Sequence, residues 1–554
     1  MAKKIFYDDD ARGRVLAGAK ELYEAVRVTM GPKGRNVVVQ KSYGGPTVTH
    51  DGVTVAKAVE IENRNDETLG RAVGAELVKQ AASKTNDTVG DGTTTATVLT
   101  YHILNEANKL IAAGHNPMDL RVGLDQAAGV VLGAVEGVTE KIAGNKTKVA
   151  QVATVSAGDG EIGGLIADVI EAVGEDGTVT VEKSEALGIT KEIVEGFKID
   201  RGYVSQYMVT DGARMEASYE KPLILVTDKK ISSIQEILPL LEKMAQGGKK
   251  ELVIVAEDVE GEALATLVLN RLKGVFNTLA IKAPAFGDRR KAILQDIAVL
   301  TGATVITDEQ GITFENATVD MLGSARKVIA TKDDTTIIEG VGDPREVQQR
   351  IAEIKAQIEH ASSEYDKENL EKRLAALAGK VAVIKVGGAT ETEIEEKKFR
   401  VDDAVAATKA AVAEGIVPGG GVTLVDLSKK LTVEPTKIGS SQEAGHLVLK
   451  RALVQPFREL MRNAGLNPDE KLPQVIAGKG GQGFDVNDPG QLVDLKAKGV
   501  VDPAKVTREA VQNAVSIAGT AMTMGSLIVD IPEDKPAAGG GMPGGMGGMG
   551  GMDY

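Results

Sequence analysis

The chain has 554 residues, of which 42% are hydrophobic and 26% are charged, so it is too long for one hydrophobic core and too ordinary in composition for a disordered or fibrous protein. It has no cysteine, which excludes disulfides, thiolate metal sites and cysteine nucleophiles, and its net charge of -14 disfavours nucleic acid as a partner. Residues 1–14 lack the apolar run of a signal peptide and no stretch has the roughly 18 to 20 apolar residues of a membrane span, so we expect a cytoplasmic, multidomain protein without a membrane partner.

Two polar, glycine-containing breaks follow helical patterns in the first hundred residues. Apolar residues recur every three or four positions over 15–26, which predicts a helix, and Thr29–Arg35 then ends it ahead of a short strand. A second helical pattern covers Glu67–Ser83, and Asn86–Gly92 interrupts it before a further helix. Each break therefore places backbone amides and polar side chains at a helix end.

The second break leads into Gly90–Thr95, where three threonines open a helix directly after an aspartate between two glycines. Free amides at a helix start bind phosphate oxygens, and threonine hydroxyls can add hydrogen bonds. Asp91 would repel a phosphate, so we expect it to hold a divalent ion such as Mg²⁺, which prefers one or two carboxylates with phosphate oxygens and water. Taken alone, the run also fits an ordinary helix cap. A lysine-containing P-loop pattern does not occur in the sequence.

The middle of the chain has a different pattern. Residues 222–227 and 252–256 are buried-type strands, and each is followed by a helical pattern, which favours layered β/α structure. We therefore expect Glu195 to about Val381 to form a domain of its own. From about Ala537 the chain is a glycine-methionine tail, which cannot bury enough apolar surface to fold.

Two more glycine-rich segments could bind a ligand, and we keep only the first as a candidate. Pro418–Gly421 follows a helix predicted over Asp403–Glu414, and it either ends that helix or brings backbone close to a ligand. Gly158–Gly163 fits the GxGxxG pattern of a dinucleotide site between a strand and a helix. We discount that site because Asp159 and Glu161 would place negative charge where a pyrophosphate binds.

Seven motifs follow one another over nearly the whole chain: Thr29–Arg35, Asp51-Gly52, Gly90–Thr95, Asn116–Leu120, Gly287–Arg290, Pro418–Gly421 and the glycine-methionine tail. Together they strongly resemble group I chaperonins, the bacterial GroEL-type family of 60 kDa chaperonins. The resemblance implies a mainly α-helical equatorial ATPase domain built from both chain ends, a small α/β intermediate domain and an α/β apical domain. The implied boundaries are equatorial 1–137 and 414–536, intermediate 138–194 and 382–413, apical 195–381, and a disordered tail over 537–554.

The resemblance also implies ATP hydrolysis coupled to protein folding, with ATP and Mg²⁺ bound and K⁺ as a further candidate cation. It implies nucleotide contacts from Thr29, Met30, Gly31, Pro32, His50, Asp91, Gly92, Thr93, Thr94, Thr95, Gly420, Asp485, Val486, Asn487 and Asp502. Asp91 would bind the metal. Asp403 resembles the carboxylate of the intermediate domain that activates the attacking water, and Asp51 lies where a second catalytic aspartate is found.

The same resemblance implies a surface in the middle domain that binds non-native client proteins and a co-chaperonin of the GroES type. Its residues would be Tyr203, Tyr207, Met208, Leu238, Leu241, Leu264, Val268 and Leu269. Without the resemblance, core packing would explain the apolar residues of these helices. With it, we expect an ATP-dependent chaperone that encapsulates clients in a homo-oligomeric ring of seven or fourteen subunits.

Several positions depart from the family pattern, among them Gln206 and Met208 in the client-binding segment. His50 replaces a common lysine, Asp485–Asn487 replaces an Asn-Ala-Ala run, and Asn63–Arg71 is a few residues longer than usual. The departures affect base contacts and cation binding more than the phosphate site. The alternative function is a metabolic enzyme that uses ATP or a dinucleotide on a small substrate, which would predict substrate-dependent turnover and a modest oligomer.

Overall fold

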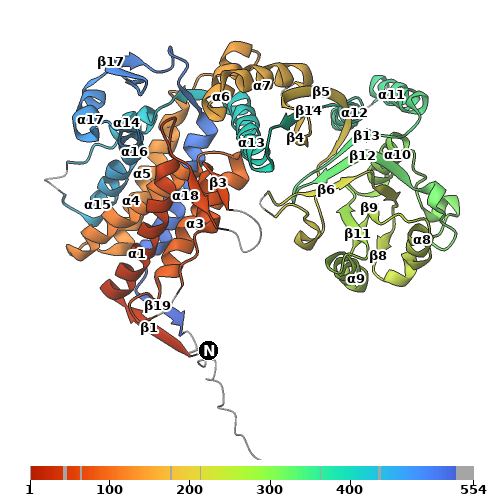
Figure 1. Cartoon of the computed structure of the whole chain (residues 1–554), viewed down its shortest axis with the longest axis horizontal. Coiled ribbons are helices and arrows are strands. Elements are labelled where there is room, and N and C mark those ends of the chain that lie inside the picture. Colours follow the sequence, from red (N-terminus) through yellow and green to blue (C-terminus); the bar gives the residue numbers. More distant parts are fainter. Residues whose placement is uncertain are drawn as a thin grey trace, which may run out of the picture.

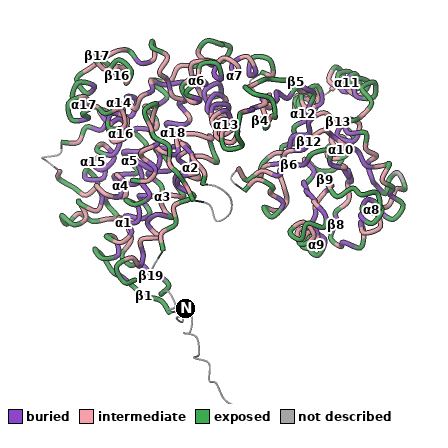
Figure 2. The backbone as a smooth tube through the Cα atoms, in the orientation of Figure 1, coloured by how far each residue is buried: buried purple, intermediate pink, exposed green. Residues whose placement is uncertain are grey.

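The computed structural model describes residues 2–40, 46–62, 65–174, 177–212, 214–361, 363–434 and 438–531. The predicted tail at 537–554 lies outside these residues. Three bodies are visible in Figure 1: a helical body made from both chain ends, a connecting body, and a central body that contains the middle of the chain. Buried residues fill the interior of each body in Figure 2.

The helical body begins with the amino-terminal elements of the chain. These are β1 (Lys3–Tyr7), α1 (Asp8–Val26), the 3-10 helix η1 (Arg27–Thr29), β2 (Val37–Val39), β3 (Thr47–Thr49), α2 (Gly52–Ala58), α3 (Arg71–Val89), α4 (Thr93–Ala112) and α5 (Pro117–Glu136). Helices α1 and α3 approach closely because Gly18 has no side chain: a Cβ there would lie 1.7 Å from the Arg71 carbonyl oxygen.

The carboxyl-terminal elements complete the same body. They are β15 (Ile416–Pro418), α14 (Val422–Ser428), α15 (Ser441–Leu453), α16 (Gln455–Asn463), α17 (Pro468–Ala477), β16 (Gln482–Asp485), β17 (Asp488–Asp494), β18 (Val501–Pro503), α18 (Ala504–Met522) and β19 (Ser526–Asp530). Buried residues of α18 share one hydrophobic core with α1, α3, α4 and α5. Strand β19 pairs antiparallel with β1, with Ile528 opposite Ile5, so the two chain ends close on one another.

The connecting body also uses two separate stretches of chain. It contains α6 (Lys146–Ala157), α7 (Gly160–Val173), β4 (Thr178–Ser184), β5 (Gly188–Ile199), β14 (Lys380–Gly387) and α13 (Glu391–Glu414). Buried residues of α6, α7 and α13 pack with β4 and β14 into one core. Strand β14 pairs parallel with β4 and antiparallel with β5.

The central body contains the predicted β/α layers. Its strands are β6 (Ala217–Glu220), β7 (Leu223–Val226), β8 (Lys230–Ile231), β9 (Glu251–Ala256), β10 (Asp258–Val259), β11 (Asn277–Lys282), β12 (Gly323–Ala330) and β13 (Thr335–Gly340). Its helices are η2 (Gln206–Met208), α8 (Ile234–Gln246), α9 (Gly261–Leu272), α10 (Gly287–Thr301), η3 (Asp308–Gln310), η4 (Val319–Met321), α11 (Pro344–Glu359) and α12 (Glu364–Leu377).

One sheet continues from the central body into the connecting body. In the described residues its strand order is β11-β9-β7-β12-β13-β5-β14-β4, and β6 also pairs with β12. Strands β7, β9 and β11 run parallel, which confirms the layered β/α pattern predicted from the two apolar runs. Strand β5 spans 12 residues and pairs with β13 on one side and β14 on the other, so it links the two bodies.

Three sequence predictions about helices need correction. Helix α3 continues through Asn86 to Val89, because the predicted polar break begins only where Gly90 adopts a φ of 70°. Helix α13 begins at Glu391, with Thr390 as its cap, twelve residues before the start that we predicted at Asp403. The GxGxxG segment follows a helix and not a strand, since Gly158 ends α6 and Asp159 caps α7.

Candidate functional site

Helix α4 begins without a side-chain cap. Its N-cap is Gly92, whose φ of 78° is left-handed, and no side-chain cap bond is formed at this end of the described helix. Neighbouring helices differ, since Asp51 caps α2 and Asn116 caps α5. The first amides of α4, starting at Thr93, are therefore available to an anion at the positive end of the helix dipole.

Helix α2 begins beside α4. The Asp51 carboxylate accepts two backbone amides of the first turn of α2, at 2.8 and 3.1 Å. A Cβ on Gly52 would lie 2.3 Å from Oγ1 of Thr94 and 2.9 Å from Oγ1 of Thr93. Oγ1 of Thr94 is also 3.2 Å from Oγ1 of Thr29. Three segments therefore converge on the threonine hydroxyls, and the missing side chain of Gly52 allows this close approach.

The turn after η1 is held by its own backbone and by α16. Gly31 has a φ of 80°, and the Gly34 amide donates to its carbonyl oxygen at 2.8 Å. Nδ2 of Asn463 donates to the carbonyl oxygens of Arg27 at 2.9 Å and Met30 at 3.0 Å. Met30 is buried and the following Pro32 is exposed. The position of this turn is thus fixed relative to α16.

His50 lies against the same turn. A Cβ on Gly34 would be 2.8 Å from Cε1 of His50. Burial lowers the pKa of His50, although the nearby charge of Glu396 opposes that shift. The imidazole is therefore neutral at pH 7, and it can offer a hydrogen bond but not a positive charge to a bound anion.

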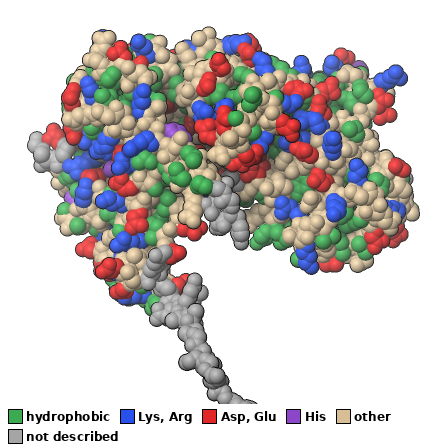
Figure 3. All heavy atoms as spheres, viewed as in Figure 1, with side chains coloured by type: hydrophobic (Ala, Val, Ile, Leu, Met, Phe, Trp, Pro, Cys, Tyr) green, Lys and Arg blue, Asp and Glu red, His purple; other side chains and the backbone are tan. Residues whose placement is uncertain are grey.

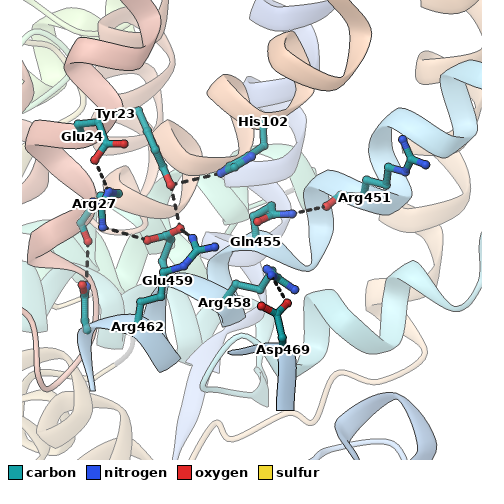
Figure 4. Close-up of polar contacts among 11 residues, drawn as sticks. Tyr23, Glu24, Arg27, His102, Arg451, Gln455, Arg458, Glu459, Arg462 and Asp469 are labelled. Atoms are coloured by element: carbon teal, nitrogen blue, oxygen red, sulfur yellow. Dashed lines mark hydrogen bonds and ion pairs between the residues drawn. The ribbon is translucent and has the colours of Figure 1, made fainter. Parts of the chain in front are cut away.

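A buried glutamate on α16 adds support (Figure 4). The Tyr23 hydroxyl donates to Oε1 of Glu459 at 2.8 Å, and Nη1 of Arg27 lies 3.4 Å from Oε2. Arg462 pairs with the same carboxylate, and Glu459 itself has 0% exposure. These contacts join α1, η1 and α16 next to the turn. We did not predict them, because an isolated glutamate in an amphipathic helix has no distinguishing sequence signal.

Four aspartates from distant segments influence one another at this site: Asp51, Asp91, Asp403 and Asp502. Burial, followed by the charge of Asp51, raises the pKa of Asp91. Burial and the charges of Asp51 and Asp91 raise the pKa of Asp403 well above its ordinary range. Burial, followed by Asp91, raises the pKa of Asp502 to about 7. These charge effects are consistent with α13 and β18 both bringing carboxylates near Asp91, directly before the start of α4.

Strand pairing brings the second glycine cluster to these aspartates. In the β15–β18 pair, Val417 lies opposite Asp502. A Cβ on Gly419 would be 3.1 Å from Oδ1 of Asp502, and Gly420 follows with a φ of 65°. The segment therefore does more than end α13, because its backbone approaches a carboxylate of the site.

The predicted residues Asp485 to Asn487 form a turn between β16 and β17. The Asp485 carboxylate accepts the Asn487 amide at 2.9 Å, so the turn closes on itself. Val486 packs against the small hydrophobic core around Phe457. None of the contacts described above joins this turn to the threonines or to the four aspartates.

The acidic side chains near the start of α4 are candidate ligands for a magnesium ion. Asp91 is partly buried, and its Oδ1 accepts the Gly92 amide at 2.5 Å, while its neighbours Asp51 and Asp502 are also acidic. In the described part of the chain, no group of three acidic or histidine side chains is close enough to hold a metal alone. The donor set therefore fits Mg²⁺, which takes most of its ligands from phosphate and water, better than a metal that needs a full protein cage.

The predicted client-binding residues are only partly at the surface. Tyr207 is 58% exposed and Leu269 is 50% exposed. Leu264, Val268, Tyr203 and Leu238 have intermediate exposure, and Leu241 is buried. Met208 requires a correction: it has 0% exposure, because η2 turns it into the core, where its sulfur accepts the Ala280 amide at 3.2 Å.

Two apolar residues extend the exposed part of that surface. Leu272, at the end of α9, is 63% exposed and Val275, three positions on, is 55% exposed. Leu272 lies three positions beyond Leu269 on α9, so the helical period could have indicated it. Val275 follows the end of α9 and has no such signal. A surface of this kind, with large apolar side chains left in water, is typical of an interaction site.

Fold and site together define a multidomain protein with the chaperonin architecture, in which a helical body with an uncapped helix start is joined through a connecting body to a β/α body. Residues 22–532 match the family described as the TCP-1/cpn60 chaperonin family, and the chain belongs to it. The protein is therefore a chaperone, and chaperonins are ATPases that form rings and act on client proteins.

A solved structure has the same fold. It is the crystal structure of the chaperonin gp146 from the bacteriophage EL 2 (Pseudomonas aeruginosa), determined in the presence of ATP-BeFx. The two chains are 20% identical with a TM-score of 0.65, and the match covers 95% of this chain and 99% of that one. Among the described residues, no helix is both long and apolar enough to cross a membrane.

Proposed function

We propose that this chain is a group I chaperonin subunit that hydrolyses ATP at the site between α2, α4, α13 and β18, and that hydrolysis times the release of client proteins. One observation carries the proposal: α13 holds Asp403 close enough to Asp51 and Asp91 for their charges to raise its pKa, directly beside the uncapped start of α4. In this proposal the bodies described above correspond to equatorial (1–137 and 414–536), intermediate (138–194 and 382–413) and apical (195–381) domains.

The phosphates of ATP bind the first amides of α4 and the hydroxyls of Thr93 to Thr95. Thr29 to Pro32, His50, Gly420, Asp485 to Asn487 and Asp502 surround the rest of the nucleotide. The support is that Gly52 lets the start of α2 approach the hydroxyls of Thr93 and Thr94 closely. No lysine is required, because helix amides and the dipole stabilise the phosphate charge.

Asp91 would hold the magnesium ion, which when bound would neutralise phosphate charge. The partly buried carboxylate of Asp91 has acidic neighbours, so a cation would stabilise its ionised form.

Asp403 accepts a proton from the attacking water. The water oxygen forms a bond to the γ-phosphorus, the bond to the bridging oxygen breaks, and ADP leaves. The raised pKa of Asp403 makes its carboxylate a stronger base than an exposed aspartate. Asp51 holds the start of α2 in place and does not accept this proton, because both of its carboxylate oxygens already accept hydrogen bonds from amides of α2.

Clients bind the exposed apolar residues of the central body. Tyr207, Leu269, Leu272 and Val275 are each at least half exposed, and the partly exposed residues on α8 and α9 extend this surface. Removing apolar area from water contributes about 25 cal/mol per Å² without sequence specificity, which suits binding to unfolded chains. The same surface would accept a co-chaperonin of the GroES type, in a cytoplasmic ring of seven or fourteen subunits.

The test is Asp403→Asn in the assembled protein, with Glu395→Gln as its control. Both carboxylates lie on α13, but Glu395 pairs with Lys183 at 3.2 Å, away from the four aspartates. Asp403→Asn should lower kcat for ATP hydrolysis by about 10²- to 10⁴-fold, the usual value of a general base, while ATP affinity changes little. Glu395→Gln should hydrolyse ATP normally. An Asp403→Asn protein with normal turnover would remove Asp403 from the reaction.

A further inference from the structure

Arg214 brings a positive charge from the central body to α13. It lies between η2 and β6, and its Nη2 is 2.9 Å from Oδ1 of Asp402. Nη1 of Arg214 is 3.5 Å from Oε2 of Glu216, on its own segment. The side chains of Arg214 and Asp402 are only 20% and 13% exposed, so the ion pair between the two bodies is poorly screened by water. Figure 3 shows acidic side chains gathered on this face near the junction of the bodies.

The segment that carries Arg214 is fixed to the central body. It is closed as a hairpin, with the Asp211 amide donating to the Glu216 carbonyl oxygen at 2.9 Å and the Glu216 amide donating back at 3.2 Å. Nη2 of Arg271, on α9, donates to the Val209 carbonyl oxygen just before this hairpin. Arg214 therefore moves with the central body and not with α13.

Asp402 is adjacent to Asp403 on α13, so a contact that fixes the position of Asp402 also fixes the position of Asp403. Among the described residues, Oδ2 of Asp402 is buried without a hydrogen-bond partner, so the ion pair with Arg214 is the contact that joins this carboxylate to the central body. The charge of Lys398, one turn earlier on α13, also acts on Asp402, but it belongs to the same helix. The surroundings of Asp403 agree with this role for Arg214. Burial and the charges of Asp51, Asp91 and Asp402 raise the pKa of Asp403, whereas the charge of Arg214 lowers it. Without Arg214, the aspartates of α13 would be repelled by Asp51 and Asp91 at the nucleotide site, and the attraction that Arg214 exerts on Asp402 would be lost.

We propose that Arg214 is a positioning residue for ATP hydrolysis: by binding Asp402 it holds α13 with Asp403 at the nucleotide site, and it makes the hydrolysis rate depend on the position of the central body. The proposal rests on the proposed function, in which Asp403 accepts the proton of the attacking water. It assigns a residue of the client-binding body to the control of a reaction in the helical body.

A matched pair of residues exists within the central body. Asp296 has 0% exposure, and Nε of Arg350, with an 18% exposed side chain, lies 2.8 Å from its Oδ1. This ion pair resembles Arg214–Asp402 in distance and in the burial of its arginine, but both of its members belong to one body, and Asp296 also binds Arg373 at 2.7 Å. Loss of Arg350 therefore reports the structural cost of removing a partly buried arginine, without any link to α13.

The experiment compares steady-state ATP hydrolysis by Arg214→Gln, Asp402→Asn, the double variant and Arg350→Gln. Coupling energies between sites are commonly worth 5- to 150-fold, so we expect kcat to fall about tenfold in each single variant at the first pair, with KM for ATP changed less than about threefold. The double variant should fall no further than a single one, because the same interaction is lost. Arg350→Gln should retain kcat even where its melting temperature falls. Wild-type kcat in Arg214→Gln, or effects that multiply in the double variant, would overturn the proposal.

A second measurement does not need hydrolysis and keeps the test decisive if a charge variant fails to fold. The chain has no cysteine, so Arg214→Cys and Asp402→Cys introduce the only two thiols. A short bis-maleimide reagent should join them within one subunit, and peptide mass mapping should find the linked pair, whereas neither single-cysteine variant should give it. Absence of this link in folded protein would refute the contact. If the unmodified protein fails to hydrolyse ATP, the proposed function is wrong, and the cross-link still shows whether the two bodies meet at Arg214.

Discussion

A Cβ added to Gly90 would lie 2.4 Å from the Cβ of Ala406, so the glycine that ends α3 also packs directly against α13. Gly90 has a φ of 70°, and Asp91 follows it directly. Ala406 is three residues after Asp403 on the same helix. The approach of Asp403 to Asp91 therefore depends on the absence of one methyl group.

Gly90→Ala should both destabilise the protein and slow ATP hydrolysis. A left-handed φ costs a residue with a side chain about 1–2 kcal/mol, and the new methyl group would push α13 away from the site. Gly158→Ala is the control, because Gly158 also has a left-handed φ of 65° but nothing lies within 4 Å of its added Cβ. Urea unfolding and ATP turnover distinguish the two: the control should lose stability only. Adding Ala406→Gly to Gly90→Ala should restore part of the turnover, and no recovery would contradict the steric explanation.

Glu459→Gln should lower the free energy of unfolding by about 2 kcal/mol. The change leaves Arg27 and Arg462 without the buried charge that they share, and removing one member of a buried ion pair costs several kcal/mol before solvent compensates the exposed guanidinium groups. Asp469→Asn, at the exposed pair with Arg458, should cost less than about 1 kcal/mol. Denaturant midpoints measure both. We also expect a higher KM for ATP in Glu459→Gln, because this glutamate supports the turn at Thr29 to Pro32. Equal denaturant midpoints for the two variants would contradict a stabilising role for the buried Glu459 carboxylate.

Leu272→Ser should weaken the binding of unfolded proteins. Leu272 is 63% exposed, and covering a leucine of this kind contributes on the order of 1–2 kcal/mol. Leu187→Ser provides the comparison, since Leu187 is 77% exposed in the segment between β4 and β5, on the connecting body. Binding of a chemically unfolded, labelled protein, followed by fluorescence anisotropy, should weaken several-fold for Leu272→Ser alone. A similar loss in both variants would mean that clients bind without preference for α9.

His102 should make the protein less stable in mild acid. Burial, and then the charge of Arg462, lowers the pKa of His102 to about 4, so the unfolded chain binds more protons than the folded one between that value and the ordinary pKa of about 6.5. The stability from the neutral ring is complete above pH 6.5 and is lost as the pH falls toward 4. His102→Phe keeps the contacts with Tyr23 and Tyr101 but cannot titrate.

Urea unfolding at pH 7.5 and at pH 5.0 measures this effect. The drop in stability between the two values should be smaller by about 2 kcal/mol in His102→Phe than in the unmodified protein. His360→Gln, at the exposed end of α11, should leave the drop unchanged. The same drop in all three proteins would show that His102 is not a source of the acid sensitivity.

Local sequence patterns were sufficient to predict several parts of this molecule. The apolar runs that became β7 and β9 are parallel neighbours in a sheet, as their composition indicates for strands buried on both faces. The start of α4 at Thr93 was also predicted, because glycine on both sides of Asp91 prevents either helix from continuing. These features depend on residues within one or two turns of each other, and such interactions are visible in sequence.

Features that depend on distant contacts were missed. Met208 was expected at the surface, but its burial is decided by β11 and Tyr219, which pack around η2. Arg214 has no motif of its own, and only the fold brings it to Asp402. Helix α13 was predicted to begin too late because its first turns carry mainly charged residues with no apolar period, while its cap at Thr390 is a weak signal.

The pairing of both chain ends in one core has a consequence for synthesis on the ribosome. The core shared by α1, α3, α4 and α5 remains open until α18, which begins at Ala504, has been made. At roughly 5–20 residues per second, translation from Glu136 to that point takes tens of seconds. During this time the nascent helices expose the apolar surface that α18 later covers, while the central body can already fold around its own core. This chaperonin chain therefore needs protection from aggregation for a long part of its own synthesis.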